Sequence, residues 1–184
     1  MKIRLIGIFC LLSLTVQAQK AAIEETVKGY FSLMQEQKIS EALDNVHPDL
    51  LNMVGKETYL KQYEQMLKNA DVKVSFGPLT IKHISEVKVH EAGKYALLDY
   101  DFVMYHELLQ ANEQTRDIVA NTLKAQFGEG YSREGDKVTV TANREMFVVA
   151  EPDFEGWRIL DYEKGMRMLL VNIIPEVVLT HFNK

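Results

Sequence analysis

The sequence predicts an α+β fold in which N-terminal helices pack on a curved antiparallel sheet (a cone), with an inserted helix and a C-terminal helix. Three observations predict it. Helical spacing of apolar residues fills positions 21–69, strand-like alternation dominates positions 72–105 and 138–162, and helical spacing returns in the insertion between them, about 106–137. The apolar segment at about 164–182 is expected to form the C-terminal helix.

The clearest strand pattern is the stretch Tyr95 to Tyr105, YALLDYDFVMY. Every second residue from Ala96 to Met104 is apolar or aromatic, which is typical of a strand with one buried face. We therefore expect helices to pack against the face that carries Tyr100. Asp99 and Asp101 share the mixed opposite face, where a solvated or dimer-facing pair is the simplest interpretation.

Three helices are expected before the sheet, at Ala21 to Gln37, Ser40 to Val46 and Lys56 to Asn69. Ser40 can cap the second of them. The pair His47-Pro48 is expected to end this second helix, because a residue before proline is disfavoured in the helical region.

Strands are expected at Val72 to Phe76, Leu79 to His90, Val138 to Asn143, Glu145 to Ala150 and Trp157 to Tyr162. The two segments on either side of Arg144 are either separate strands or one strand with a bulge near Arg144.

A hairpin should join the second and third strands at positions 91–94, EAGK. If these four residues form the loop, His90 pairs with Tyr95. This register sets His83 opposite Phe102, on the apolar face of the sheet.

The insertion contains a further helix, which Asn112 can cap and which should end at Phe127 before Gly128. Two interpretations stay open. The helix could lie across the mouth of whatever the sheet encloses, or it could supply extra packing.

The first 18 residues read as a signal peptide. Lys2 and Arg4 give a positive start, an apolar run from Leu5 to Val16 follows, and small residues precede a cut expected before Gln19. The protein is therefore expected to be exported, to the periplasm or beyond the cell. Residues 19–184 should form a single domain, and Cys10, the one cysteine, lies in the leader.

Charge argues against nucleic acid and anionic membranes as partners. The formal net charge is −5, and removal of the leader with its two basic residues makes it −7. The apolar C-terminal segment is too short to span a bilayer. It is expected either to close the core or to form an exposed interface.

Motifs for metal and cofactor chemistry are lacking. The segment HELLQ at 106–110 resembles a zinc-protease motif but has glutamine where the second histidine should stand. There is also no nucleophile elbow, phosphate-binding glycine loop, dinucleotide fingerprint or calcium loop. No metal and no cofactor are expected.

The order of elements resembles the nuclear transport factor 2-like superfamily, the α+β cone shared by SnoaL-like cyclases and ketosteroid isomerases. The residues that carry the resemblance are the opening segment AIEETVKGYFSLMQEQKISEAL, the tripeptide GKE at 55–57 and the last strand, GWRIL at 156–160. The likeness covers about Ala21 to Tyr162. It implies a pocket between the concave sheet face and the first helices, often within a homodimer, but no single activity.

The leading hypothesis is a periplasmic, non-catalytic module that binds a small apolar or amphipathic molecule, or a protein partner. The pocket is expected to be lined by Tyr30, Met34, His83, Tyr100, Phe102, Met104 and Trp157.

Two alternatives remain. A histidine on an apolar strand face could be a general acid or base near neutral pH, with Tyr100 or Tyr30 donating to an enolate. His83 would then serve a cofactor-free isomerase, dehydratase or cyclase, unless it is a core histidine held by a backbone carbonyl or Ser85. The third interpretation is an interaction protein whose tail, Met166 to Leu179, docks on a partner.

Overall fold

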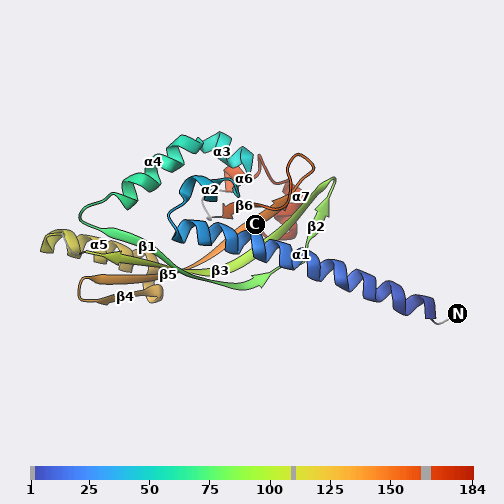
Figure 1. The fold of residues 1–184 in the computed structure, drawn as a ribbon, viewed down its shortest axis with the longest axis horizontal. Helices are drawn as coiled ribbons and strands as arrows, with labels where there is room; N and C mark the ends of the chain where they lie inside the picture. Colours follow the sequence, from blue (N-terminus) through green and yellow to red (C-terminus); the bar gives the residue numbers. More distant parts are fainter. Residues whose placement is uncertain (1–2, 109–110, 163–166) are drawn as a thin grey trace.

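The computed structural model describes residues 3–108, 111–162 and 167–184, with side chains from Val16 onward. The predicted fold class is confirmed. N-terminal helices pack on a six-stranded antiparallel sheet, one helix is inserted between strands, and helices follow the last strand (Figure 1).

Four helices precede the sheet: α1 (Ile3–Gln35), α2 (Ile39–Leu43), α3 (Pro48–Val54) and α4 (Lys56–Leu67). The predicted role of Ser40 is wrong, since Lys38 is the N-cap of α2. His47-Pro48 begins a helix that the sequence pattern did not predict. The His47 Nδ1 accepts a hydrogen bond from the Asp49 N–H at 3.2 Å, and Pro48 occupies the first helical position.

Helix α1 runs without a break through the expected cut before Gln19. Its N-terminal part projects away from the rest of the protein (Figure 1). Among the side chains described from Val16 onward, Ile23 is the first that is buried. Within the described ranges, no helix combines the length and apolar character that crossing a membrane requires.

The strands are β1 (Lys73–Ile84), β2 (Lys88–His90), β3 (Gly93–Glu107), β4 (Tyr131–Glu134), β5 (Lys137–Ala150) and β6 (Arg158–Tyr162). Their order is β1-β3-β5-β4, with β2 also paired to β3 and β6 also paired to β5. Strand β3 is central in this order, and it contains the stretch Tyr95 to Tyr105 that was predicted to be a strand.

The predicted hairpin register is wrong. The loop between β2 and β3 has two residues, Glu91 and Ala92, so that His90 pairs with Gly93 rather than with Tyr95. In β1 the pairing also shifts between Phe76 and Leu79 and again between Ile81 and His83. Bulges of this kind change which face the following side chains occupy, and a sequence pattern does not reveal them.

The inner face, defined here as the sheet face that carries Tyr100, is covered at one end by α1. Ile23, Val27 and Phe31 of this helix pack on Leu98 and on the buried residues of β5 and β6 beside it.

The inserted helix α5 (Glu113–Phe127) covers the other end of the inner face and is followed by η1 (Gly128–Gly130). Its predicted cap is confirmed, because the Asn112 side chain accepts a hydrogen bond from the Thr115 N–H at 2.9 Å. The inward residues Val119, Leu123 and Phe127 pack in the cluster of Leu108, Val138 and Val140. This contact supports the packing interpretation of the insertion.

The outer face is covered beside β6 by two short helices, α6 (Arg167–Leu170) and α7 (Glu176–His181), rather than by one helix over about 164–182. Pro175 interrupts them, and residues 163–166 lie outside the described ranges. Leu170, Ile174, Val178 and Leu179 are fully buried, and Phe182 lies 5.6 Å from Phe147 between ring centroids. The tail therefore closes the core, although Met168, Leu169, Val171 and Val177 stay exposed.

Candidate functional site

A ring of aromatic side chains lies between α4, α1 and the inner face of the sheet. Ring centroids are 5.2 Å apart for Tyr30 and Phe31, 5.0 Å for Phe31 and Phe102, 5.6 Å for Phe102 and Phe76, and 6.4 Å for Phe76 and Tyr63. Tyr63 and Tyr30 also interact electrostatically with each other, which closes the ring. Four elements thus contribute to one apolar surface.

A carboxylate lies beside this ring. The Tyr100 hydroxyl donates to Asp161 Oδ1 at 3.4 Å, and the Tyr100 ring lies 5.4 Å from Phe31. The negative charge of Asp161 also raises the pKa of Tyr30, Tyr59 and Tyr63. We call these four tyrosines with Asp161 the tyrosine cluster.

The phenols of the tyrosine cluster are held neutral. Burial raises the pKa of Tyr30 and of Tyr100 well above the usual value, and the negative charge of Asp161 adds to the rise. Burial also raises the pKa of Tyr59 and Tyr63. At neutral pH the cluster therefore presents hydroxyl groups that donate and accept hydrogen bonds, beside one carboxylate that accepts them.

Helix α4 covers the tyrosine cluster incompletely. Tyr59 and Tyr63 lie one helical turn apart on the side facing the sheet, yet no residue of α4 is fully buried. Asp161 is exposed, and Tyr30, Tyr63 and Phe102 are only half-buried. The carboxylate and the half-buried part of the ring thus reach solution, whereas Phe31 is buried.

The structure brings three of the predicted site residues together. Tyr30, Tyr100 and Phe102 all belong to the aromatic surface around Phe31.

The remaining predicted residues lie elsewhere. Met34 is buried in the cluster of α2 and the C-terminal helices, and Met104 packs near α5. Trp157 is buried beside Ile23, where it lines a separate hollow of about 510 Å³.

The predicted placement of His83 is wrong. His83 pairs with Asp99 instead of Phe102 and is exposed, because the shift after Ile81 moves it to the outer face. It is therefore not part of the tyrosine cluster. Asp101 on the same outer face pairs with Lys82 at 2.8 Å and accepts a hydrogen bond from Asn143 at 3.1 Å, as expected for a solvated carboxylate.

A second polar group is buried at the joint between the helices and the sheet. His47 is 2% exposed, and its Nε2 lies 3.7 Å from Glu151 Oε2, which is beyond hydrogen-bond distance. The other Glu151 oxygen accepts a hydrogen bond from the Tyr95 hydroxyl at 3.1 Å. Burial lowers the pKa of His47, although the Glu151 carboxylate opposes this shift.

The backbone around His47 explains its burial. The His47 N–H donates to the Ile159 carbonyl at 2.9 Å, and the Ile159 N–H donates to the Asn45 carbonyl at 2.8 Å. Residues 45–47 thus extend the sheet beyond β6, and the imidazole fills the space beneath Phe154. The His47 side chain is therefore buried where the helices meet the sheet.

Sequence comparisons identify no relative. No protein-family model matches this chain, and no curated protein matches it.

The side chains of the tyrosine cluster indicate which kinds of ligand the site could bind. Within the part of the chain that the structure describes, no three His, Cys, Asp or Glu side chains gather in a way that could hold a metal ion. The cluster offers neutral phenols, one carboxylate and an aromatic surface. Such a surface suits a ligand with an apolar body and one polar end.

Sequence reasoning missed Tyr59, Tyr63, Phe76 and Asp161. The four-residue spacing of Tyr59 and Tyr63 on a predicted helix indicated a shared face. Nothing local indicated that this face would meet Asp161, which is 98 positions beyond Tyr63 in the chain. Only the packing of α4 on the sheet joins them.

Proposed function

We propose that this protein is an exported binding module of the nuclear transport factor 2-like type that holds a small amphipathic molecule between α4 and the inner face of the sheet. The observation that carries the proposal is the aromatic ring with Asp161 at its edge. An apolar ligand body would stack on the half-buried Phe76 and Phe102, and a donor group at its end would reach the carboxylate.

The superfamily assignment is supported by the order of elements. Helices come first, and the antiparallel sheet that follows offers its covered face to them. Export is supported by the sequence of the leader and by the position of the first buried side chain, Ile23, after the expected cut. N-terminal sequencing of the protein recovered from the periplasm or the medium tests export, and a mature chain that still begins with Met1 would contradict it.

Binding is tested with two matched probes, 2-naphthol and 2-methoxynaphthalene. Both have the same ring system, but only the naphthol can donate a hydrogen bond. We expect the naphthol to bind more tightly, as measured by its fluorescence. Asp161→Asn should weaken binding of the naphthol about tenfold and leave the methyl ether nearly unchanged, because the charge-assisted hydrogen bond contributes to one probe only.

Two controls make the result specific. Asp153→Asn removes an exposed carboxylate remote from the ring and should change neither affinity. Phe102→Leu should weaken both probes, because both stack on the same surface. Equal affinities of wild type, Asp161→Asn and Phe102→Leu for both probes would contradict the proposal.

A second candidate is cofactor-free proton transfer, as in an isomerase, dehydratase or cyclase. One observation favours it: the Asp161 carboxylate lies beside neutral phenols. The carboxylate could take a proton from a carbon acid, and a phenol could donate a hydrogen bond to the resulting enolate. Exchange of the α-protons of 2-tetralone for deuterium tests this activity. An exchange rate that is higher than in buffer alone and falls to the buffer rate in Asp161→Asn would favour the enzyme over the binding module.

A further inference from the structure

The outer face of the sheet carries an exposed aromatic side chain at the end remote from α7. Tyr105 is 39% exposed, although it lies on the central strand β3. Its ring leans over Gly77 of β1, where an added Cβ would lie 2.7 Å from Tyr105 Cε2. A glycine at this position therefore leaves room for the ring to lie along the sheet.

Two hollows adjoin on this face. The first has a volume of about 470 Å³, and its lining includes Tyr105, Thr139 of β5 and Ser132 of β4. The second has a volume of about 710 Å³, and its lining includes Ser132 again, with Thr141 and Asn143 of β5. Both volumes fall within the range of about 300–1,000 Å³ that is usual for ligand pockets. The shared residue Ser132 makes the hollows neighbours.

A row of polar side chains on β5 leads from one hollow to the next. Its members are alternate residues of the strand and share the outer face: Lys137, Thr139, Thr141 and Asn143. We call this row the polar track. Thr139 is half-buried and the other three are exposed. At about 3.4 Å per residue the polar track is roughly 20 Å long.

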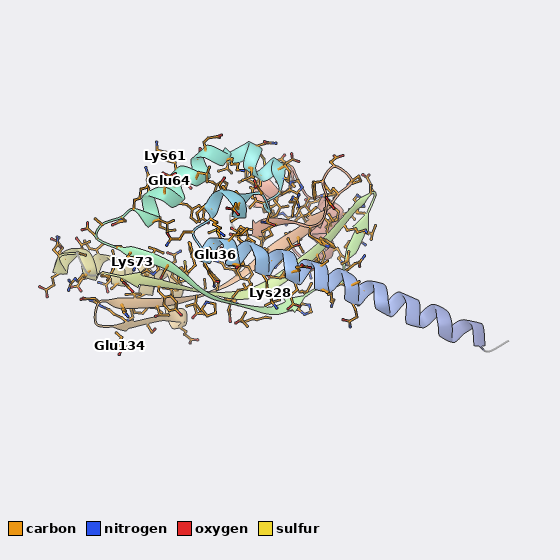
Figure 2. All side chains as sticks on the ribbon, in the orientation of Figure 1. Lys28, Glu36, Lys61, Glu64, Lys73 and Glu134 are labelled. Carbon is orange, nitrogen blue, oxygen red and sulfur yellow. The ribbon has the colours of Figure 1, made fainter. Side chains whose placement is uncertain are left out.

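The charged side chains around the polar track balance one another. Four cross-strand neighbours at the end of the sheet alternate in sign: Lys73, Glu107, Lys137 and Glu134. Figure 2 labels Lys73 and Glu134, which lie at the same end of the sheet. Farther along the face, Asp101 pairs with Lys82 at 2.8 Å. Such a balance favours a neutral ligand over an anion or a cation.

We propose that Tyr105 and the polar track bind a neutral, extended oligosaccharide, with one sugar ring on Tyr105 and the following rings along β5. The C–H face of a sugar ring is apolar and can pack on a phenol ring, whereas its hydroxyl groups donate and accept hydrogen bonds. The polar track offers partners of both kinds, because the Thr139 and Thr141 hydroxyls and the Asn143 amide each contain a donor and an acceptor.

The composition of the face favours a saccharide over a protein partner. Among the large apolar side chains that the structure describes as exposed, only Tyr105 belongs to this part of the outer face. The centre of a protein interface is apolar and depleted in charged residues, whereas this face combines one aromatic ring with hydroxyl, amide and charged groups. The strands β3 and β5 also hold these groups at fixed spacing, which suits a ligand with regularly spaced hydroxyls.

The shape of the site predicts a dependence on chain length. A β-1,4-linked glucose chain is flat and nearly straight, so it matches a straight row on one strand. Cellobiose is short enough to be held by the first hollow alone, whereas cellotetraose can also reach Thr141 and Asn143 in the second. The longer chain should therefore bind more tightly.

Titration of the protein with cellotetraose and with cellobiose, followed by NMR chemical shifts of the backbone amides, tests the proposal. We expect a dissociation constant of about 0.1–1 mM for cellotetraose, because an open site leaves much of the ligand in water. Cellobiose should bind at least fivefold more weakly. Shifts should concentrate on β5 and around Tyr105.

Variants of the aromatic wall should affect both probes. Tyr105→Ala should weaken both at least tenfold, whereas Tyr105→Phe should keep most of the affinity because the ring remains. Gly77→Ala should also weaken both, because the added methyl group displaces the Tyr105 ring without removing any group that the sugar contacts.

A variant of the polar track should separate the two probes. Thr141→Val removes one hydroxyl from the second hollow and should weaken cellotetraose about threefold while leaving cellobiose unchanged. Thr122→Val is the matched control, because Thr122 is an exposed threonine of α5, and it should change neither affinity. Circular dichroism verifies that each variant is folded.

Two outcomes would overturn the proposal. One is the absence of cellotetraose binding up to about 10 mM, and the other is an affinity that Tyr105→Ala and Thr141→Val both leave unchanged. Asp161→Asn should not alter cellotetraose binding, since this carboxylate is on the inner face. The naphthalene probes report on the inner face alone, so failure of this proposal is distinguishable from failure of the proposed function.

Discussion

The Tyr100 hydroxyl lies 3.4 Å from Asp161 Oδ1, although 61 positions separate the two residues in the chain. Tyr100 is on the central strand β3, and Asp161 is on β6. Strand β5 runs between these two strands, and both side chains point to the inner face. The contact connects a buried tyrosine, 4% exposed, to an exposed carboxylate. Burial of this phenol, to which the Asp161 charge adds, affects how the protein should respond to alkaline pH.

The buried phenols should limit stability at high pH. Burial raises the pKa of Tyr30 and Tyr100, and raises the pKa of Tyr95 to about 12, whereas a tyrosine in the unfolded chain ionises near 10. The stabilisation is fully present below about pH 10 and is lost as the pH rises further, because the unfolded chain then releases protons that the native state retains. Phenolate absorbance should show a late step that coincides with unfolding.

The variants that check this assignment are Tyr100→Phe and Tyr105→Phe. Tyr100→Phe should reduce the late step by one phenol, and Tyr105→Phe, which removes an exposed phenol, should leave it intact. If every tyrosine ionised in one early step while the fold persisted, the burial of the cluster would be refuted.

Mildly acidic pH should lower the free energy of unfolding through His47. Burial lowers the pKa of this imidazole in the folded protein below the value of about 6.5 in the unfolded chain, so the unfolded state binds the proton more readily. The free energy of unfolding should therefore fall as the pH is lowered from about 7.5 to about 5.5. Glu151 and Asp49 oppose this effect, and Arg158 adds to it.

His47→Asn is the matched variant for this measurement. Asparagine keeps an acceptor for the N-terminus of α3 but does not titrate. Urea unfolding at the two pH values should show a smaller difference for the variant than for the wild type. An identical pH dependence in both proteins would assign the effect to other groups.

The cap of α5 should contribute measurably to stability. Asn112→Ala removes the acceptor of the Thr115 N–H and should cost about 1 kcal/mol in the free energy of unfolding. Asn121→Ala, at an exposed position within the same helix, should be neutral or slightly stabilising, because alanine is the better helix former. Chemical denaturation compares the two, and equal effects would argue against a capping role.

The C-terminal helix should be part of the core rather than an attached tail. Leu179→Ala empties a fully buried position and should cost about 2–5 kcal/mol, whereas Val177→Ala alters a side chain that is 51% exposed and should cost less than about 0.5 kcal/mol. Thermal unfolding of the two variants measures the difference. Equal stability would mean that α7 does not pack as described.

Local signals explain what could be predicted for α5 and β3. Asn112 and Gly128 bound the inserted helix, and each acts through its own backbone neighbours. The alternation of Ala96, Leu98 and Tyr100 likewise reports burial of one strand face, whatever covers it. Such features depend on interactions within a few residues.

The candidate site depended on interactions across the chain. His83 was assigned to the wrong face, since bulges and loop length in β1 and β2 are decided by how the strands pair. Asp161 was overlooked for the same reason, because its partners come from α1, α4 and β3.

By itself, the sequence determined the α+β class, the position of the central strand and the inserted helix with its cap, because periodicity and capping are local properties. Only the tertiary structure decided which side chains share a face and which of them meet. Register and helix placement are set by the free energy of the whole core, in which a shift of one residue exchanges the two faces of a strand.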